Sequence, residues 1–193
     1  MDIRGLTLCS DDDDCLNGGN CTLEDDGAYN QVCKCAVPFG GDRCELDCSA
    51  NAVGVADRDI IKDTQFTSYG TYSSNHPWYG RLNYGSYYWR GSWLQVSFNK
   101  LYEVYAVETQ GYSSSYGVTA FRLLSSIDGN TFTYYTESSS SYKTFSMSQG
   151  SKITRNELKV RTRMSAIRFY VTGYSSYPYL RVEVYGCPVI DVE

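Results

Sequence analysis

Three segments in the second half of the chain alternate apolar with polar side chains over six residues each. They are residues 93–98, 166–171 and 180–185. Because neighbouring side chains on a strand point to opposite faces, this alternation places one face on a core and the other in water. No helical period of ten or more residues appears, and the four prolines all lie outside these segments. The pattern predicts an all-β sandwich or barrel.

The eight cysteines fall into two groups. Six lie between Cys9 and Cys44, and the other two, Cys48 and Cys187, bracket a long segment without cysteine. An even number allows every thiol to be paired, which is typical of proteins outside the reducing cytosol. The layout predicts a small disulfide-rich module followed by a larger domain that is closed by one bridge. It argues against a thiol nucleophile or a thiolate zinc site, since either needs unpaired cysteines.

The composition changes near residue 48. Residues 1–47 hold eleven acidic and three basic side chains, a charge of −8. The remainder holds eleven acidic and fourteen basic side chains, a charge of +3, so the net charge of the chain is −5. Eighteen of the nineteen tyrosines also follow Cys48. We therefore expect a domain at 1–47, a second at 48–187 and a tail at 188–193. The first is too short to bury a sufficient core, so its bridges must stabilise it.

The sequence also bears on where the protein works. No stretch approaches the roughly 20 apolar residues of a membrane-spanning helix. The first residues lack the apolar run of a secretory signal, so we expect that a signal has been removed. Together with the cysteine arithmetic, this predicts a secreted, extracellular protein.

The first six cysteines carry a specific spacing, which is Cys9-x5-Cys15-x5-Cys21-x11-Cys33-x-Cys35-x8-Cys44. The count alone permits fifteen pairings. The spacing resembles that of the EGF-like family over residues 9–44. This resemblance implies the bridges Cys9–Cys21, Cys15–Cys33 and Cys35–Cys44.

A second series of motifs runs in order between Cys48 and Cys187. The motifs are Asp63-x-Gln65, Arg81-Leu82-Asn83, Trp93-Leu94-Gln95-Val96, Thr109-Gln110-Gly111, Ser126-Ile127-Asp128-Gly129 and Leu180-Arg181-Val182-Glu183-Val184-Tyr185-Gly186-Cys187. In this order they resemble the discoidin family, also called the coagulation factor five and eight C-type domain. The resemblance implies an eight-stranded jelly-roll β-sandwich with Cys48 bridged to Cys187. The expected fold is thus mainly β, with a small EGF-like module followed by a discoidin-like sandwich.

Family members bind ligands through loops at one end of the sandwich, and three loops here correspond by order. These loops, at 68–79, 111–116 and 173–179, are rich in Tyr, Ser and Gly. Tyrosine offers a rigid ring with a hydroxyl tip, and Ser and Gly add adaptable polar contacts, so we expect a partly polar ligand. The candidate ligand-binding residues are Tyr69, Tyr72, His76, Trp78, Tyr79, Tyr87, Arg90, Tyr112, Tyr116, Tyr174 and Tyr177. Arg90 is included because a guanidinium can receive a carboxylate, phosphate or sulfate group.

Other aromatic and basic side chains are expected to be structural. Tyrosine packs readily in sheets, so those within strand-like runs are assigned to the fold: Tyr102, Tyr105, Tyr134, Tyr135, Tyr170 and Tyr185. Arg81, Arg168 and Arg181 belong to the scaffold motifs, where we expect them to pair with internal carboxylates or carbonyls.

The favoured function is an extracellular adhesion or recognition protein that binds a cell-surface or matrix glycan or protein through these loops. The alternative is peripheral binding to phosphatidylserine-containing membranes, for which Trp78 is the one strongly apolar candidate. A third hypothesis is a tyrosine-rich surface adhesive. Multivalent assembly would strengthen a shallow site. The negative charge and lack of a basic stripe argue against nucleic acid.

Catalysis and cofactors find little support in the sequence. The chain has one histidine and none of the motifs that mark a nucleophile, a phosphate loop or a His metal cluster, so we expect no enzyme activity. No cofactor is required. Calcium is considered at Asp57, Asp59 and Asp63, because hard cations need converging oxygens and some sugar-binding relatives hold a structural ion.

Overall fold

The computed structural model describes residues 9–23, 31–70, 74–138 and 141–189. Over these residues the chain consists almost entirely of β-strands and connecting loops, with no α-helix. Three short 3₁₀ helices span Asp12–Asp14, Asp63–Gln65 and Pro77–Gly80. Within the same residues, no helix has the length and apolar character needed to cross a membrane.

The N-terminal part consists of two small antiparallel pairs. Strand β1 (Asn20–Leu23) pairs with β2 (Gln31–Lys34), and β3 (Phe39–Gly40) pairs with β4 (Leu46–Asp47). Its disulfides are Cys9–Cys21, Cys15–Cys33 and Cys35–Cys44, which is the pairing that the EGF-like resemblance implies. The buried hydrophobic residues described before Cys48 are themselves cysteines: Cys9, Cys15 and Cys44. In this part, disulfides therefore take the place of an apolar core.

Ten further strands build the rest of the chain. They are β5 (Phe66–Tyr69), β6 (Trp89–Arg90), β7 (Trp93–Gln110), β8 (Gly117–Ser126), β9 (Thr133–Tyr134), β10 (Thr136–Ser138), β11 (Ser141–Tyr142), β12 (Thr144–Ser146), β13 (Ile153–Ser175) and β14 (Tyr179–Pro188). Antiparallel pairing in the order β12-β8-β13-β7-β14-β6 joins most of them, with β5 added to β7 and β9 to β8.

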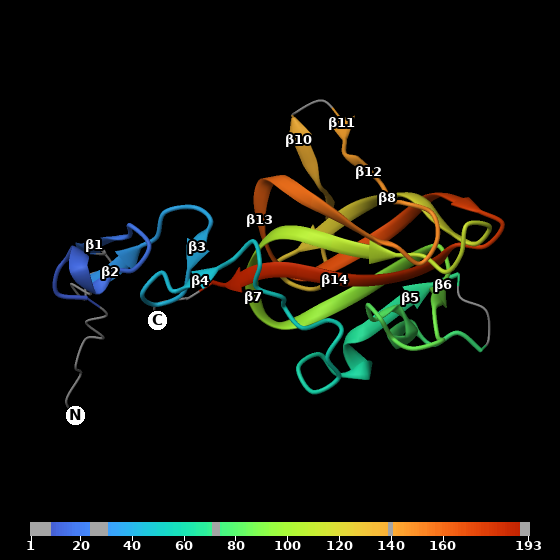
Figure 1. The fold of residues 1–193 in the computed structure, drawn as a ribbon, viewed down its shortest axis with the longest axis horizontal. Coiled ribbons are helices and arrows are strands. Elements are labelled where there is room, and N and C mark those ends of the chain that lie inside the picture. The colour runs from blue at the N-terminus through green and yellow to red at the C-terminus, as the bar shows by residue number, and fades with distance from the viewer. Residues whose placement is uncertain (1–8, 24–30, 71–73, 139–140, 190–193) are drawn as a thin grey trace.

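Strands β7 and β13 each bend and serve both halves of a sandwich (Figure 1). Residues 93–97 of β7 pair with 166–170 of β13, whereas residues 106–110 pair with 153–157. The first part of β7 also joins β5, and the last part of β13 joins β8, whereas the second part of β7 joins β14. The register shifts between Glu157 and Thr162, where the direction of β13 changes. The prediction of a mainly β, jelly-roll-like discoidin fold is confirmed.

The core lies between the two halves and is supplied by the alternating segments. Leu94, Val96, Ile167, Phe169 and Val182 are fully buried. In residues 180–185, however, the second face is buried as well, because Arg181 and Glu183 are each only 4% exposed. The expectation of one solvated face is wrong for this strand, since loops before β5 and before β6 cover that side.

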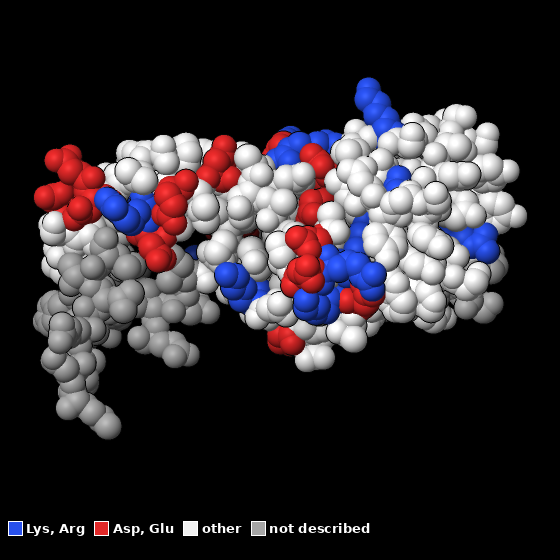
Figure 2. Space-filling model, turned by 60° about the horizontal axis from the view of Figure 1, so that its bottom comes forward, with Lys and Arg blue, Asp and Glu red and all other residues white. Residues whose placement is uncertain are grey.

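The Cys48–Cys187 disulfide joins the two ends of the sandwich and contacts the N-terminal part. A Cβ added to Gly40 would lie 2.7 Å from the Cys48 sulfur. This bridge and strands β1–β4 lie at one end of the molecule, while β5, β6 and the loops after β7 and β13 lie at the other (Figure 1). Acidic side chains gather over the N-terminal part and the middle, and none shows at the opposite end on the face seen in Figure 2.

Candidate functional site

The three loops expected to bind ligand lie at the same end of the sandwich (Figure 1). We call this the loop end; its described residues are 70, 74–92, 111–117, 147–152 and 173–180. The six described candidate tyrosines with large exposed areas range from 37% exposure at Tyr116 to 66% at Tyr69. These six side chains therefore point outward.

Gln110, the last residue of β7, holds two of the loop segments in place. Its side-chain nitrogen donates to the Asn83 Oδ1 at 3.1 Å and to the Ser151 carbonyl at 2.9 Å. Its side-chain oxygen accepts from the Asn83 backbone N–H at 3.2 Å. Gln110 is buried, so its amide satisfies loop groups that would otherwise lose their hydrogen bonds to water.

Five rings form a continuous tyrosine cluster, made by Tyr88, Tyr112, Tyr116, Tyr177 and Tyr179. Ring centroids are 4.7 Å apart for Tyr88 and Tyr112, 5.6 Å for Tyr112 and Tyr179, and 5.7 Å for Tyr116 and Tyr177. The rings come from three different loops or strand ends. Their mutual contacts pre-organise an aromatic surface, since rings that pack on one another lose little further freedom when a ligand binds.

A second group of rings surrounds the short 3₁₀ helix at Pro77–Gly80. His76 stacks on Trp78 at 4.2 Å, and Tyr79 stacks on Tyr87 at 4.6 Å. Trp78 is half-buried and packs against the hydrophobic core. The tryptophan expected as an apolar spike is thus held against the molecule. Gly80, at the end of this helix, lies directly against the core, because a Cβ there would lie 2.4 Å from the Leu94 side chain.

A cavity of about 390 Å³ lies between the two groups of rings. We call it the Tyr112 cavity. It is lined by Ser74, Asn75, Tyr79, Ser86, Tyr87, Tyr88, Tyr112 and Tyr179. The Asn75 side chain donates to the Tyr88 carbonyl at 3.0 Å and so holds two walls together. Aromatic faces beside serine hydroxyls and an amide suit a ligand with both apolar and hydroxylated surfaces.

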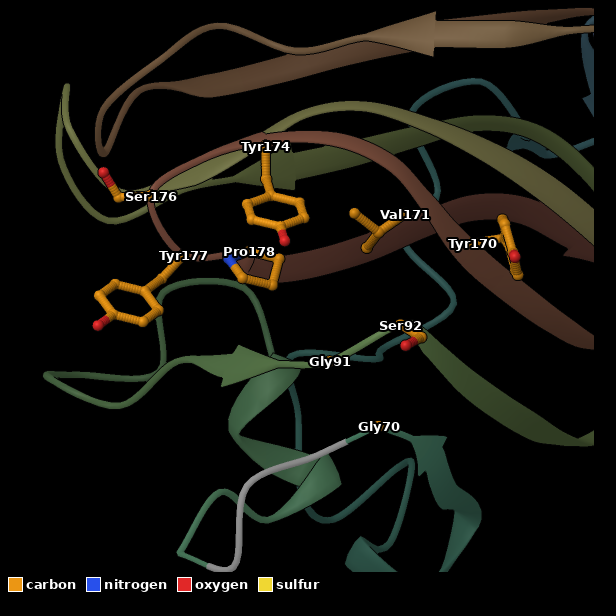
Figure 3. A pocket seen from close by; sticks show the side chains of 9 residues that line it. All are labelled: Gly70, Gly91, Ser92, Tyr170, Val171, Tyr174, Ser176, Tyr177 and Pro178. Atoms are coloured by element: carbon orange, nitrogen blue, oxygen red, sulfur yellow. The ribbon is translucent and has the colours of Figure 1, made fainter.

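A second cavity of about 320 Å³ lies beside the loop after β13. We call it the Tyr174 cavity. It is lined by Gly70, Gly91, Ser92, Tyr170, Val171, Tyr174, Ser176, Tyr177 and Pro178 (Figure 3). Tyr170 was expected to be structural, yet it is 38% exposed and lines this cavity. Its side chain lies on the outer face of β13, opposite the buried Phe169.

Two arginines lie behind the aromatic walls. The Arg90 guanidinium is 5.2 Å from the Tyr177 ring centre and 5.9 Å from that of Tyr179. The Arg181 guanidinium is 4.1 Å from the Tyr88 ring centre and donates to the Gly85 carbonyl at 3.0 Å. Burial lowers the pKa of Arg181, because the charged form loses its hydration. Both side chains support the platform and give it positive charge.

Not every candidate joins these two cavities. Tyr69 stacks on Trp93 at 6.3 Å, away from the tyrosine cluster. Tyr72 lies outside the described residues. The scaffold role expected for Arg81 agrees with its contacts, because its guanidinium donates to the Val55 and Ile61 carbonyls and to Asp63.

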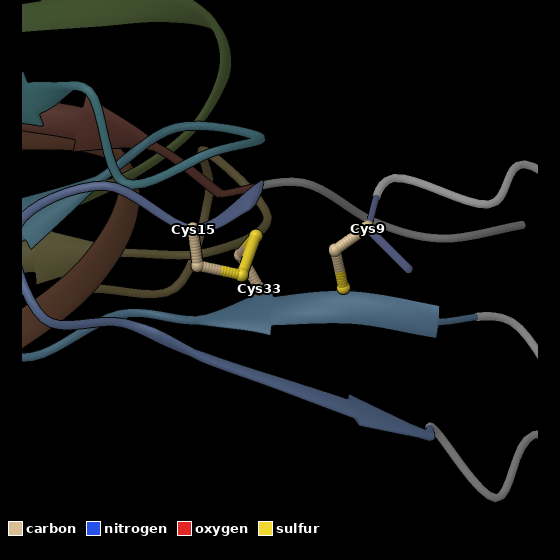
Figure 4. Close-up of side chains that lie close together, drawn as sticks. All are labelled: Cys9, Cys15 and Cys33. Carbon is tan, nitrogen blue, oxygen red and sulfur yellow. A yellow bond between two sulfur atoms is a disulfide. The ribbon is translucent and has the colours of Figure 1, made fainter. Parts of the chain in front are cut away.

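The calcium candidates do not converge in the described structure. Although burial raises the pKa of Asp63, hydrogen bonds from Arg81 and Arg58 hold it below its ordinary value, so this carboxylate is already paired. Asp57 accepts from the Asp59 backbone N–H at 2.7 Å. Among the described residues, one trio of possible metal ligands lies within 4.8 Å, namely Cys9, Cys15 and Cys33. These sulfurs belong to disulfides, so they offer no thiolate (Figure 4).

Sequence reasoning did not select Tyr88, Tyr179 and Arg181 as candidates. Tyr179 and Arg181 share one face of β14, and Arg90 is the partner of Tyr179 on β6. The alternation of residues 180–185 extends back to Tyr179 and places it on the same face as Arg181. This pattern could have identified both residues from the sequence. Tyr88 had no such signal, because its contact with Tyr112 joins residues far apart in the chain.

The chain matches a known protein family. Residues 63–184 match the F5/8 type C domain. The matched segment contains β5 to β14 except for the last residues of β14, and it includes both cavities.

Solved structures show the same fold. Discoidin II from Dictyostelium discoideum aligns with a TM-score of 0.61 and 18% identity, covering 73% of this chain and 60% of that one. A CBM32 module from a Clostridium perfringens family 31 glycoside hydrolase aligns at 0.51 and 16% identity, covering 66% and 97%. The family 32 module of C. perfringens NanJ, in complex with galactose, aligns at 0.50 and 11%, covering 65% and 96%. This chain therefore spans only part of discoidin II, and the shared fold is that of a binding module.

Proposed function

This chain belongs to the F5/8 type C domain family, and on that premise we propose that it is an extracellular recognition protein that binds a glycan at its loop end. Adhesion to cell surfaces or matrix would follow from such binding. The proposal assigns recognition to the tyrosine cluster and to the Tyr112 cavity, with no catalytic step.

The observation that carries the proposal is the arrangement of rings around the Tyr112 cavity. Tyr79 and Tyr87 lie on one side, and Tyr88, Tyr112 and Tyr179 on the other. A sugar presents apolar C–H faces and hydroxyl edges, and tyrosine offers an apolar ring with a hydroxyl that can donate or accept. The cavity thus has the mixed chemistry that a sugar ring needs.

The structural neighbours support a glycan as the ligand class. The NanJ module was solved with galactose bound, and the family 31 glycoside hydrolase carries its CBM32 as a module. At the identities observed here, these likenesses establish the fold, so the identity of the sugar rests on this chain's own side chains.

The N-terminal part fits an extracellular setting. Its bridges follow the order expected for an EGF-like module, and eight cysteines form four disulfides with none left free among the described residues. We propose that this part is an EGF-like spacer or second contact, and that the protein is secreted.

Membrane binding has less support from the side chains at the loop end. Insertion into a bilayer gains most from exposed aliphatic or tryptophan side chains. Among the described residues of the loop end, the exposed large side chains are tyrosines, and Trp78 is held by His76 and by the core.

Glycan array binding of the full chain tests the proposal. Changing Tyr87 and Tyr112 together to Ala removes two walls of the Tyr112 cavity, so we expect at least about tenfold weaker binding, or about 1.4 kcal/mol. Tyr142→Ala is the matched control, because Tyr142 is also exposed at 54% but stacks on Tyr134 outside both cavities. Glycan binding that survives the double change, or is lost equally in the control, would reject this site.

A further inference from the structure

The loop end lacks acidic side chains, although the chain as a whole is acidic. The segments 64–102, 109–127, 138–156 and 158–182 contain neither Asp nor Glu, while the net charge of the chain is −5. The visible face agrees, since the end that carries β5 and β6 shows blue side chains without red ones (Figure 2).

The nearest carboxylates along the strands are already engaged. Glu108 pairs with Arg155 at 3.5 Å and accepts from the Tyr185 hydroxyl at 2.9 Å. Glu183 is buried and accepts from the backbone N–H groups of Val55 and Ala56, both at 2.8 Å. Neither carboxylate is therefore available to neutralise positive charge at the loop end.

Arg181 is a buried cation without a carboxylate partner in the described structure. It is 4% exposed, its Nε has no hydrogen-bond partner there, and its guanidinium lies against the Tyr88 ring. Tyr88 lines the Tyr112 cavity, so the charge lies directly behind one cavity wall. A buried charge is screened less by salt than an exposed one, and cavity walls of low polarity focus its field.

Arg90 strengthens this field, and the loop end carries a further cation at Lys152. Arg90 lies behind Tyr177 and Tyr179, which belong to the walls of the Tyr174 cavity and the Tyr112 cavity respectively. Lys152 is exposed and follows Ser151, whose carbonyl accepts from Gln110 at 2.9 Å. Each cavity thus has an arginine behind its wall, and the segments that form the loop end contain no acidic side chain to neutralise it.

From this charge arrangement we infer that the loop end binds an acidic glycan, one carrying a carboxylate or a sulfate, in preference to its neutral counterpart. The inference rests on the proposed function and adds the charge of the ligand. The rings contact the sugar, and the arginines attract its anionic group through a site that carries no opposing charge.

The test uses the full chain on an array where neutral glycans stand beside the same glycans carrying a sialic acid or a sulfate. We expect the acidic member of at least one pair to bind about tenfold more tightly, a difference of about 1.4 kcal/mol. Raising the salt from about 0.1 M to about 1 M shortens the Debye length from about 10 Å to about 3 Å and should reduce that preference.

Two charge-removing variants connect the preference to the arginines. Arg90→Met and Arg181→Met retain apolar length but lose the charge. Each should lower the ratio of acidic to neutral binding, including where the loss of ring support weakens the binding of both partners. Lys159→Met is the matched control, because Lys159 is 77% exposed and pairs with Glu137, away from the loop end. Arg90 is half-buried, so Arg90→Met decides the question if Arg181→Met fails to fold.

Each alternative result has a distinct meaning. Equal binding of acidic and neutral partners overturns the inference and leaves the proposed function standing. A preference that both arginine variants retain also overturns it. If the chain binds no glycan, the proposed function itself is rejected. If it binds only phosphatidylserine vesicles, the proposed function is also rejected, and the ligand is a membrane.

Discussion

At the scale of single residues, the two buried charges of β14, Arg181 and Glu183, differ in how their polar groups are satisfied. Glu183 and Arg181 are both 4% exposed, yet they lie two positions apart and do not pair with each other. Glu183 is satisfied by three backbone N–H groups, those of Val55, Ala56 and Val184. Arg181 is supported by a ring and one carbonyl. Glu183 therefore holds the chain before β5 in place, whereas Arg181 contributes its charge to the loop end.

Glu183 should give the protein a specific pH dependence. Burial raises its pKa above the ordinary value of 4.5, although the backbone N–H groups oppose this. The folded chain then holds the proton to higher pH than the unfolded chain does. The stabilising contribution is therefore present below pH 4.5 and is lost as the pH rises through the raised pKa.

Glu183→Gln removes this titration. We expect the difference in free energy of unfolding, wild type minus variant, to decrease as the pH rises from about 4 to about 7. Urea unfolding at several pH values measures it, and groups that titrate in both proteins cancel in the difference. A difference that is constant, or that grows with pH, would contradict the raised pKa.

At the scale of elements, the sequence predicted the positions of the strands far better than it predicted which strands pair with one another. Residues 93–98, 166–171 and 180–185 lie within β7, β13 and β14, as the alternation predicted. Alternation did not show that β7 and β13 bend and continue into the other half, because each half repeats the same period. The family motifs supplied that topology.

The candidate site was predictable only to the level of its loops. The Tyr, Ser and Gly composition pointed to the loops that carry Tyr112, Tyr116 and Tyr177. It could not show that Tyr88 and Tyr179 complete the cluster, because their contacts depend on the register of β14 against β6 and on the path of the loop before β6.

One close approach between elements gives a sharp mutational test. A Cβ added to Gly186 in β14 would lie 2.4 Å from the Glu103 carbonyl oxygen in β7. Because the neighbour is backbone, Gly186→Ala must push the strands apart, and we expect a loss of about 3 kcal/mol in the free energy of unfolding.

Gly117→Ala is the control for that substitution. Gly117 begins β8, and its Cβ would meet its nearest neighbour at an ordinary 3.5 Å. The variant should stay within about 1 kcal/mol of wild type. Denaturant unfolding of both variants measures the contrast, and similar stability in the two would argue against the close β14–β7 contact.

At the scale of the whole molecule, ligand contact and chain closure lie at opposite ends. The loop end carries the tyrosine cluster and the buried Arg181. The other end carries strands β1–β4 (Figure 1), and the Cys48–Cys187 bridge lies beside Gly40 of β3. Phe39 and Gly40 of β3 pair with Asp47 and Leu46, directly before Cys48. The bridge thus joins both ends of the sandwich at the point where the N-terminal part begins, and it can be altered without touching the site.

Removal of that bridge tests this separation. The Cys48–Cys187 disulfide closes a segment of 139 residues, and constraining so long a loop in the unfolded chain stabilises by about 5 kcal/mol. Changing both cysteines to Ala, which leaves no buried hydroxyl, should lower the free energy of unfolding by about that amount. Below the unfolding transition, glycan affinity should remain unchanged, because the bridge lies far from the rings.

Changing Cys35 and Cys44 together to Ala is the matched control. It opens a segment of only 9 residues within the N-terminal part and should leave the free energy of unfolding of the sandwich unchanged. A fall in glycan affinity after loss of the long bridge would show that chain closure and the loop end are coupled.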